Sequence, residues 1–287
     1  MQRALGTSGI TVNAIGYGEW PLSDVNRPPD EVGVDVIRQA VEAGADLIDT
    51  ADSYCLTDDD FGHGERLVRK ALKEIGISAT VTVATKGGYA RADGDWIPAG
   101  RPERITECCK ASLERLGVDA IDLYQLHTPD PEVPVEDSLG AMADLQQAGL
   151  VRHIGVSNVD HELLARAQTV AKIESVQNEC NVLKQDDIAS GLIEHCADEN
   201  ITYIPWCPLG GESGQQEIAN HPVLQELSQK YGVSVYRLQL RWLLSLGDNV
   251  LPIPGAKRAT SILDSLAATL LEIEAEDLAR IGAIGSA

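Results

Sequence analysis

The sequence predicts a (β/α)8 barrel that spans residues 1–287 as one domain. Short β-rich runs alternate with longer amphipathic segments along the whole chain, no low-complexity linker divides it, and its length suits one such barrel. The main alternative is a doubly wound open sheet. A dinucleotide-binding sheet of that kind would show GxGxxG after an early strand, whereas the first expected strand leads into GYGEWPLS and the fingerprint is absent.

Eight strands are expected where short runs rich in β-branched and other apolar residues end in turn-forming or polar residues. They cover residues 13–18, 46–49, 81–86, 121–127, 151–157, 174–177, 202–206 and 250–253.

The expected helices fall between these strands and after the last one. Gly44, Gly76, Gly117 and Gly149 lie where helices should end, and Pro102 suits a first helical turn. The helices are expected at residues 31–43, 65–75, 102–116, 135–148, 161–170, 186–200, 224–246 (divided into two), 259–270 and 276–282.

Composition and charge limit the class of protein. The chain is 44% hydrophobic, which supports a large core and argues against gross disorder. Its formal net charge of −21 argues against nucleic acid or an anionic membrane as partners. The acidic residues are expected to form a solubilising surface, and a salt-adapted host is the alternative. The start MQRALGTSGITV lacks the features of a signal peptide and no segment is long enough to span a membrane, so a soluble cytoplasmic protein is expected.

The cysteines and histidines do not suggest a metal site. The six cysteines form no CxxC, and two of them, Cys108 and Cys109, are adjacent. Reduced, mostly buried thiols are therefore expected. No HExxH occurs in the chain, and His63, in FGHGE, is expected to lie in an exposed loop.

Titratable residues end three consecutive expected strands. Asp49, Lys86 and His127 take these positions, and Tyr54 follows five residues after Asp49. Strand ends converge on one face of a barrel, so these side chains should meet there. A buried Lys86 needs the counter-charge of Asp49. The ammonium should lower the phenol pKa of Tyr54 from about 10 toward neutrality and make it a general acid, with His127 donating to a carbonyl oxygen or assisting the proton transfer.

From LGTSGITVNAIGYG to the final helices, the chain resembles the aldo-keto reductases. The motifs LIDTADSY, VATKGG and DLYQLH carry the resemblance, and it implies that Asp49, Tyr54, Lys86 and His127 form a catalytic tetrad. GVSN and SVQNECN imply residues that hold the nicotinamide carboxamide, and WCPLGG implies an aromatic ring that stacks on the nicotinamide. The expected carboxamide and stacking residues are Ser157, Asn158, Gln177 and Trp206.

The resemblance implies hydride transfer between a nicotinamide cofactor and an aldehyde or ketone, with Tyr54 protonating the oxygen. The expected partner is thus a small carbonyl or alcohol substrate. Two alternatives of other classes stay open. One is a cofactor-binding regulatory protein that resembles potassium-channel β-subunits, and the other is a lyase or isomerase that uses Tyr54 and Lys86 without net redox chemistry.

The segment IPGAKRATS is expected to bind cofactor phosphate. It combines a glycine turn, the cations Lys257 and Arg258, and the start of a helix, which favours NADPH over NADH. Ser261 and Ser265 stand where many family members carry arginine and asparagine, and GESGQQ could cover the pyrophosphate. The expected cofactor contacts beyond the carboxamide and stacking residues are Pro208, Leu209, Gly210, Ile253, Gly255, Lys257, Arg258, Ser261 and Ser265.

The long segment GGYARADGDWIPAG is expected to shape the substrate pocket, because long loops at this barrel face often do so. Trp96 within it and Trp20 after the first strand are the expected pocket walls. This segment and WCPLGG also resemble a bacterial branch that includes pyridoxal reductases.

Overall fold

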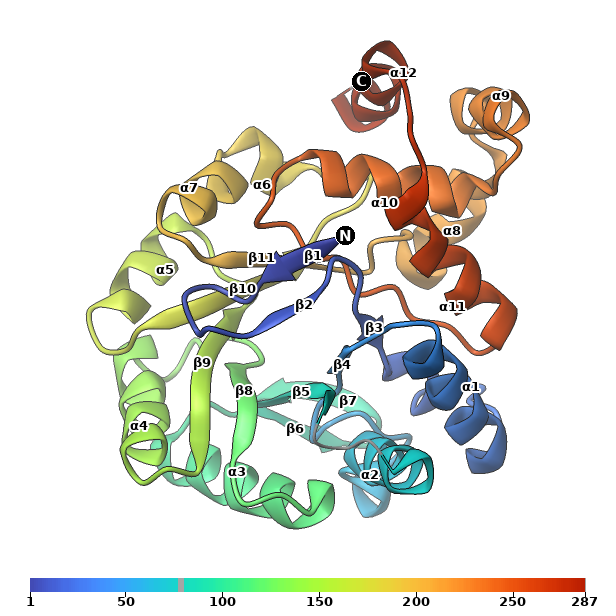
Figure 1. Cartoon of the computed structure of the whole chain (residues 1–287). Helices are drawn as coiled ribbons and strands as arrows, with labels where there is room; N and C mark the ends of the chain where they lie inside the picture. The colour runs from blue at the N-terminus through green and yellow to red at the C-terminus, as the bar shows by residue number, and fades with distance from the viewer. Residues whose placement is uncertain (77–79, 287) are drawn as a thin grey trace.

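The computed structural model describes residues 1–76 and 80–286 and has the predicted barrel architecture. Seven parallel strands form one sheet in the order β11-β10-β9-β8-β5-β4-β3, and helices surround it (Figure 1). The seven strands are β3 (Tyr17–Gly18), β4 (Leu47–Asp49), β5 (Thr82–Gly87), β8 (Ile121–Leu126), β9 (Val151–Ser157), β10 (Ile173–Glu179) and β11 (Thr202–Trp206).

The segment 250–255 closes the barrel between β11 and β3. The Leu251 amide donates to the Tyr203 carbonyl at 2.9 Å, and the Gly18 amide donates to the Pro254 carbonyl at 3.2 Å. The strand expected at 250–253 is nevertheless reduced to isolated bridges. Pro252 and Pro254 cause this interruption, because proline has no N–H group to donate to a neighbouring strand.

An N-terminal hairpin closes the amino-terminal end of the barrel (Figure 1). It pairs β1 (Gln2–Ala4) with β2 (Thr11–Asn13), so the strand expected at 13–18 is divided between β2 and β3. Leu5 and Val12 bring the hairpin into an apolar cluster inside the barrel. The cluster consists of Leu5, Val12, Leu47, Ala84, Leu123, Ile204, Leu251 and Ile253.

The helices follow the predicted alternation, with two corrections. Residues 186–200 form two helices instead of one, because Gly191 adopts a left-handed φ of 77° between them. A helix that was not expected, α8, contains the segment GESGQQ, whose role as a cover for the pyrophosphate stays a prediction. The helices are α1 (Asp30–Glu42), α2 (His63–Ile75), α3 (Pro102–Leu116), α4 (Val135–Gln147), α5 (His161–Gln168), α6 (Asp186–Ala189), α7 (Leu192–Asp198), α8 (Gly211–Asn220), α9 (Pro222–Tyr231), α10 (Val235–Ser245), α11 (Ala259–Leu266) and α12 (Ala275–Gly282), with short 3-10 turns η1 (Trp20–Leu22), η2 (Asp58–Asp60), η4 (Ala267–Leu270) and η5 (Ala283–Ser286).

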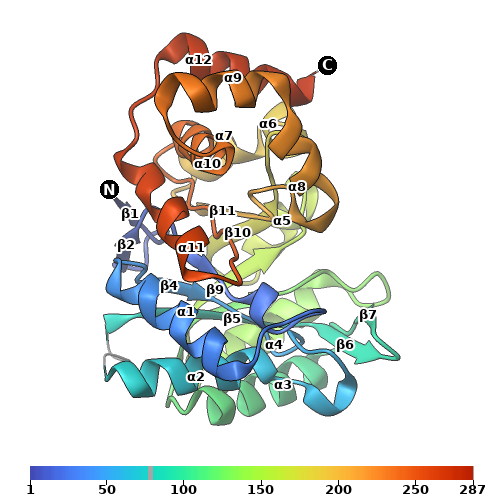
Figure 2. The same ribbon diagram turned by 90° about the vertical axis from the view of Figure 1, so that its right-hand side faces the viewer.

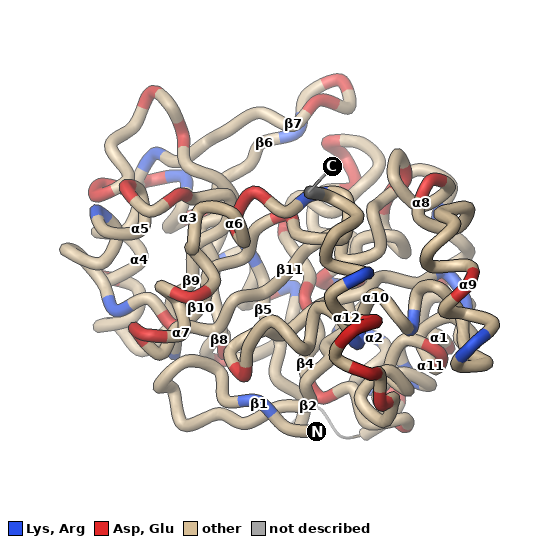
Figure 3. Tube along the Cα trace, turned by 90° about the horizontal axis from the view of Figure 1, so that it is seen from above, with Lys and Arg blue, Asp and Glu red and all other residues tan. Residues whose placement is uncertain are grey.

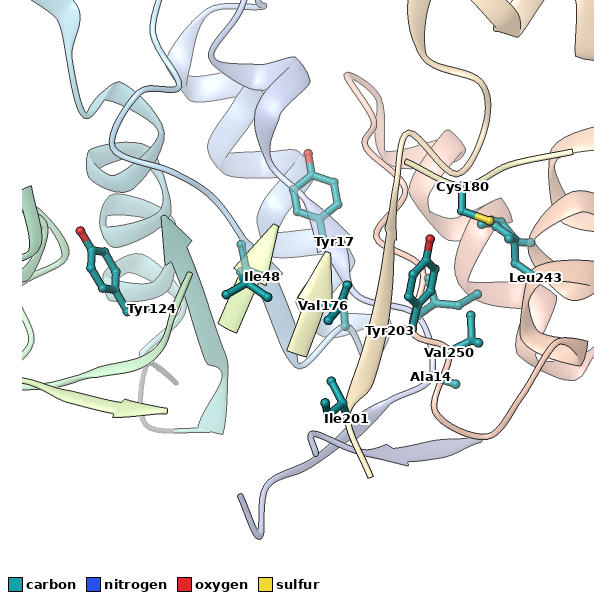
Figure 4. Close-up of a cluster of buried hydrophobic side chains, with 14 of the residues drawn as sticks. Ala14, Tyr17, Ile48, Tyr124, Val176, Cys180, Ile201, Tyr203, Leu243 and Val250 are labelled. Carbon is teal, nitrogen blue, oxygen red and sulfur yellow. The ribbon is translucent and has the colours of Figure 1, made fainter. Parts of the chain in front are cut away.

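The larger apolar core lies between the outer face of the strands and the helices. Part of it is drawn in Figure 4, including Ile48, Val176 and Tyr203 from strands and Leu243 from α10. The segment GGYARADGDWIPAG forms an antiparallel hairpin outside this core, made of β6 (Tyr89–Ala92) and β7 (Asp95–Pro98). Figure 2 shows this hairpin on the opposite side of the molecule from β1 and β2, which places it at the carboxyl ends of the strands.

Other expectations from composition can be compared with the structure. All six cysteines are free, and five are buried, as predicted. Acidic residues occur on many elements around the molecule (Figure 3). Among the described residues, no helix has both the length and the apolar character that a bilayer crossing requires.

Barrel closure should depend on the absence of a side chain at Gly18. A Cβ at this position would lie 2.7 Å from the Ile253 carbonyl oxygen, which belongs to backbone that cannot move aside easily. We expect Gly18→Ala to lower the free energy of unfolding by about 2 kcal/mol, measured by urea denaturation.

Gly140→Ala is the matched control for that substitution. Gly140 lies inside α4, and its Cβ would meet no atom within 4 Å. Alanine favours helix there, so this variant should be as stable as the parent or more stable by up to about 1 kcal/mol. Equal stability of the two variants would show that the contact at Gly18 does not constrain barrel closure.

Candidate active site

Strand alternation separates an apolar lower layer from a polar upper layer inside the barrel. Residues two apart on a strand point to the same face. Leu47, Ala84 and Leu123 join the inner apolar cluster, and the residues two positions later are Asp49, Lys86 and Gln125. The polar layer therefore lies toward the carboxyl ends of the strands, where barrel sites are built.

Lys86 is the centre of the polar layer. Its ammonium is completely buried and donates to Asp49 Oδ1 at 2.5 Å, to the Thr50 carbonyl at 2.9 Å and to the Tyr54 hydroxyl at 2.9 Å. These three acceptors match the three donors of an ammonium group. The structure thus brings together Asp49, Lys86 and Tyr54, as the sequence predicted.

Two glutamines hold the Asp49 carboxylate in place. Asp49 Oδ2 accepts from Gln177 Nε2 at 2.8 Å and from Gln125 Nε2 at 3.2 Å. Gln125 was not predicted from the sequence, although its spacing of two from His127 in DLYQLH predicts that both point inward, Gln125 from β8 and His127 from the position directly after it.

The predicted direction of the Tyr54 pKa shift is wrong. Burial is the largest influence and raises the pKa of the Tyr54 hydroxyl well above its ordinary value, and the Asp49 and Glu19 carboxylates raise it further. Burial also lowers the pKa of Lys86, against the pull of Asp49. The site therefore holds Tyr54 as a neutral phenol at pH 7, the form that can donate a proton.

His127 lies beside Tyr54 as a neutral imidazole. Their ring centroids are 5.6 Å apart, and His127 Nδ1 is 3.3 Å from the Ser53 hydroxyl. Burial, followed by the Lys86 ammonium, lowers the pKa of His127 well below its ordinary value. His127 can therefore act as a hydrogen-bond donor or acceptor at pH 7 without carrying a charge.

An aromatic wall from the β6–β7 hairpin stands next to these groups. The Trp96 ring lies edge to face with Tyr54, Tyr89 and His127, at centroid distances of 6.2, 5.2 and 5.8 Å. The Arg91 guanidinium lies 4.1 Å from the Trp96 ring. Trp96 is thus beside the tetrad. Within the described part of the chain no ring contact places Trp20, in η1, and its pocket role stays a prediction. Tyr89 was missed because a hairpin residue carries no strand-end signal.

Three residues predicted to meet the nicotinamide form a connected group. Asn158, with a left-handed φ of 59°, donates from Nδ2 to the His127 carbonyl and the Ser157 hydroxyl and accepts from Trp206 Nε1 at 3.3 Å. Gln177 is not part of this connected group, because its amide nitrogen donates to Asp49 instead.

The other predicted cofactor residues follow β11 and the closing segment. Gly210 has φ of 86° and precedes α8, and the Pro208 carbonyl accepts from Gln239. Lys257 is half-buried with Nζ 3.0 Å from the Val25 carbonyl, and Arg258 is exposed. Arg258 precedes α11, which starts without a side-chain cap.

Ile253 and Ser265, two further predicted cofactor residues, are also buried. Ile253 belongs to the inner apolar cluster, so only part of it could contact a ligand. The Ser265 hydroxyl already donates to the Ser261 carbonyl, one turn earlier in α11. Ser265 would have to give up this bond in order to donate to a cofactor. Leu209, Gly255 and Ser261 stay predictions.

Comparison with known proteins identifies the family. A sequence model of the aldo/keto reductase family matches residues 14–286. The chain belongs to the aldo/keto reductase family. Membership confirms the predicted enzyme class, an NAD(P)H-dependent oxidoreductase.

Named relatives and solved structures agree with this assignment. The chain is 33% identical to pyridoxine 4-dehydrogenase of Escherichia coli, over 98% of this chain and 96% of the relative. It is 30% identical to the aldo-keto reductase YhdN of Bacillus subtilis, over 89% and 84% of the two chains. A crystal structure of a thermostable aldo-keto reductase bound to the inhibitor epalrestat superposes with a TM-score of 0.84 at 29% identity and covers 99% of this chain and 100% of that one.

Near the site, His63 differs from expectation, and Asp52 is a buried residue that the sequence did not single out. His63 is 6% exposed at the start of α2, so the expected exposed loop is wrong. Asp52 is fully buried, and the Cys108 thiol, a weak donor, lies beside its carboxyl group. Neither Asp52 oxygen has a hydrogen bond of good geometry within the described part of the chain. Burial, followed by the Glu65 carboxylate, raises the pKa of Asp52 to about 7.

Asp52 should make stability depend on pH. Since its pKa is about 7 in the folded state and about 3.9 when unfolded, the folded state binds the extra proton between these values. Its contribution to stability is therefore lost as pH rises from about 4 to 7. We expect Asp52→Asn to be more stable than the parent at pH 8, on the order of 3 kcal/mol, and the difference to shrink toward pH 4 in urea denaturation.

Asp58→Asn provides the control for this measurement. Asp58 is exposed in η2, so its substitution should leave the stability curve parallel to that of the parent. A constant stability difference between Asp52→Asn and the parent at every pH would contradict the burial of a protonated Asp52.

Proposed function

We propose that the chain is a single catalytic domain, residues 1–287, that reduces aldehydes or ketones with NADPH, or oxidises the corresponding alcohols, with Tyr54 as the general acid and base. The observation that carries this proposal is the contact of a half-buried tyrosine hydroxyl with a fully buried lysine–aspartate pair. The bound cofactor would supply the hydride, and the protein would supply orientation and the proton.

Tyr54 would donate its proton to the substrate oxygen as negative charge develops there. The resulting phenolate would lie 2.9 Å from the Lys86 ammonium, which stabilises it. Asp49 keeps Lys86 charged in spite of burial and fixes its position. In alcohol oxidation the same phenolate would accept the proton.

His127 would orient the substrate oxygen. We assign the Ser53 hydroxyl as donor to His127 Nδ1, which leaves the ring proton on Nε2. A neutral Nε2–H can donate to a carbonyl oxygen without adding charge next to Lys86. This role agrees with the low pKa of the ring.

The residues around the strand ends fit a nicotinamide dinucleotide. Trp206 is half-buried, so part of its indole is available for stacking, and Asn158 and Ser157 present polar groups beside it. The uncapped start of α11 and the neighbouring Lys257 and Arg258 would hold phosphate. Gln177 would meet the carboxamide through its amide oxygen, because its nitrogen is committed to Asp49.

The aromatic wall favours a planar substrate. Trp96 and His127 lie edge to face with the Tyr54 ring, and Tyr89 lies edge to face with both of them, an arrangement that suits a flat apolar group bearing the carbonyl. The similarity to a pyridoxine 4-dehydrogenase supports pyridine aldehydes and alcohols as the first compounds to test.

Tyr54→Phe should abolish reduction and leave NADPH binding within a few-fold of the parent. The substitution removes the proton donor and keeps the ring. Steady-state oxidation of NADPH with a panel of aldehydes measures the first effect, and fluorescence titration measures the second. Consumption of NADPH in equal amount to product also separates reduction from a lyase or isomerase reaction. Retained turnover by Tyr54→Phe would remove Tyr54 as the acid.

The basic pair should distinguish the two nicotinamide cofactors. We expect Lys257→Ala combined with Arg258→Ala to weaken NADPH binding by about 10- to 100-fold and NADH binding by less than about threefold, because only NADPH carries the additional phosphate. Quenching of tryptophan fluorescence, with Trp206 as reporter, gives both dissociation constants. Lys110→Ala, at an exposed position on α3, is the control. Equal weakening of both cofactors would refute the phosphate assignment.

A further inference from the structure

A second buried carboxyl group lies behind the Lys86–Asp49 pair. Glu19 follows β3 directly, is completely buried, and its backbone amide donates to the Asp49 carbonyl at 2.9 Å. One carboxylate oxygen accepts from Thr50 Oγ1 at 3.0 Å, and the carbonyl of the same threonine accepts from Lys86. Glu19 is thus separated from the Lys86 ammonium by a single residue.

A chain of hydrogen bonds leads from Glu19 toward the surface. The Ser23 hydroxyl donates to the other Glu19 oxygen and lies 2.7 Å from His63 Nδ1. His63 Nε2 lies 3.1 Å from Asp30 Oδ1, and the Asp30 side chain is 50% exposed. The buried carboxyl is therefore connected to solvent by an unbroken series of groups that can donate and accept protons.

The chain needs space that only glycine provides. A Cβ on Gly64 would lie 2.3 Å from Glu19 Oε2 and 2.6 Å from Thr50 Oγ1. His63 and Gly64 are neighbours at the start of α2, so FGHGE supplies both a member of the chain and the room for its carboxyl end. The FGHGE motif, which lies outside the tetrad, is explained by these two contributions to the chain.

We infer that Glu19 is a positioning residue whose carboxyl exchanges a proton with solvent through Ser23, His63 and Asp30, and thereby sets the charge beside Lys86 when Tyr54 gives up its own proton. The inference depends on the proposed role of Tyr54 as the acid. It adds a proton-carrying chain that does not contact the substrate.

The proton balance of the chain has two forms. In the first, Glu19 is ionised and accepts from Ser23, and a doubly protonated His63 donates from Nδ1 to Ser23 Oγ. In the second, the Nδ1 proton has moved to Ser23 and the Ser23 proton to Glu19. His63 is then neutral and donates from Nε2 to Asp30. The total number of protons is unchanged: Glu19 is negative and His63 positive in the first form, and both are neutral in the second. Release of one proton to solvent from the Asp30 end leaves an ionised Glu19 and a neutral His63, so exchange with solvent changes the charge beside Lys86.

Several charged or titratable groups face Glu19 from the surrounding elements. They are Tyr17 on β3, Asp49 on β4, Tyr54 in the loop after β4, Lys86 on β5, His63 on α2 and Asp30 on α1. Burial raises the pKa of Glu19 to about 7, and Lys86 lowers it while Asp49 raises it. The carboxyl can therefore gain or lose a proton near neutral pH.

Proton uptake by Glu19 should make Tyr54 a stronger acid. The Glu19 carboxylate is one of the charges that raise the pKa of Tyr54. When Glu19 is neutral, one negative charge fewer opposes formation of the phenolate. A proton that moves inward to Glu19 thus compensates for the proton that leaves Tyr54.

The first experiment follows the chain in the purified protein without added substrate. Subtracting the infrared spectrum of Glu19→Gln from that of the parent should leave a carboxylic acid C=O band of Glu19. This band should disappear as pH rises through about 7. Long-range 15N NMR, with His63→Gln to assign the signals, should show the ring nitrogen shifts of His63 changing between the parent and Glu19→Gln at one fixed pH, because a single Ser23 hydroxyl joins the two side chains. Unchanged His63 ring shifts in Glu19→Gln and no pH-dependent acid band assignable to Glu19 would overturn the inference.

The second experiment measures the pH dependence of kcat for carbonyl reduction. The parent rate should fall about tenfold between pH 6 and 8.5 as Glu19 ionises, whereas Glu19→Gln, which is neutral and of similar shape, should hold its rate within about twofold. His161→Gln, at an exposed position on α5, should follow the parent. A rate lowered equally at every pH in Glu19→Gln would show a structural role only.

The proposed acid role of Tyr54 and the inferred proton chain to Glu19 can be refuted separately. Activity retained by Tyr54→Phe would refute the proposed acid and leave the spectroscopic coupling of Glu19 and His63 intact. Loss of that coupling with an inactive Tyr54→Phe would refute the proton chain and leave the reductase proposal standing.

Discussion

The rest of the site depends on one buried ion pair. The Lys86 ammonium has no exposed surface, so it can stay charged only because Asp49 lies 2.5 Å away and two further oxygens accept its remaining protons. Asp49 in turn is held by Gln125 and Gln177 from strands across the barrel. Loss of either charged partner would leave the other buried without a counter-charge. The position of the Tyr54 hydroxyl therefore depends on the packing of β4, β5, β8 and β10, which carry the pair and the two glutamines.

Burial shapes the acid–base properties of the groups around this pair. It keeps Tyr54 protonated and His127 uncharged, and it raises the pKa values of Glu19 and Asp52 to about 7. Apart from its ion-pair partner Asp49, Lys86 thus has titratable neighbours that are neutral or only partly ionised at physiological pH. Such a setting allows a proton to leave Tyr54 with little rearrangement of other charges.

The aldo/keto reductase family assignment and the local geometry agree on the type of chemistry. Proton donation requires a phenol that is open to a substrate, and Tyr54 is half-buried among otherwise buried partners. The β6–β7 hairpin adds an aromatic wall whose Trp96 is held by Arg91. Hairpins at this end of the barrel can vary without disturbing the strands, so the proposed substrate wall lies on an element whose sequence can change without loss of the fold.

The sequence by itself determined the strand–helix alternation, the bounds of β9, β11 and α3, and the strand-end positions of Asp49, Lys86 and His127. Each of these follows from the local periodicity of apolar and polar residues, which depends only on residues close together in the sequence. Only the tertiary structure decided the pKa directions of Tyr54 and Glu19, the contact of Gln125 with Asp49, and the burial of His63 against Ser23. These depend on which distant residues surround a group and how much water they exclude. Since desolvation of a buried phenol can outweigh one adjacent ammonium, a motif alone predicts the neighbours of Tyr54 but not its acidity.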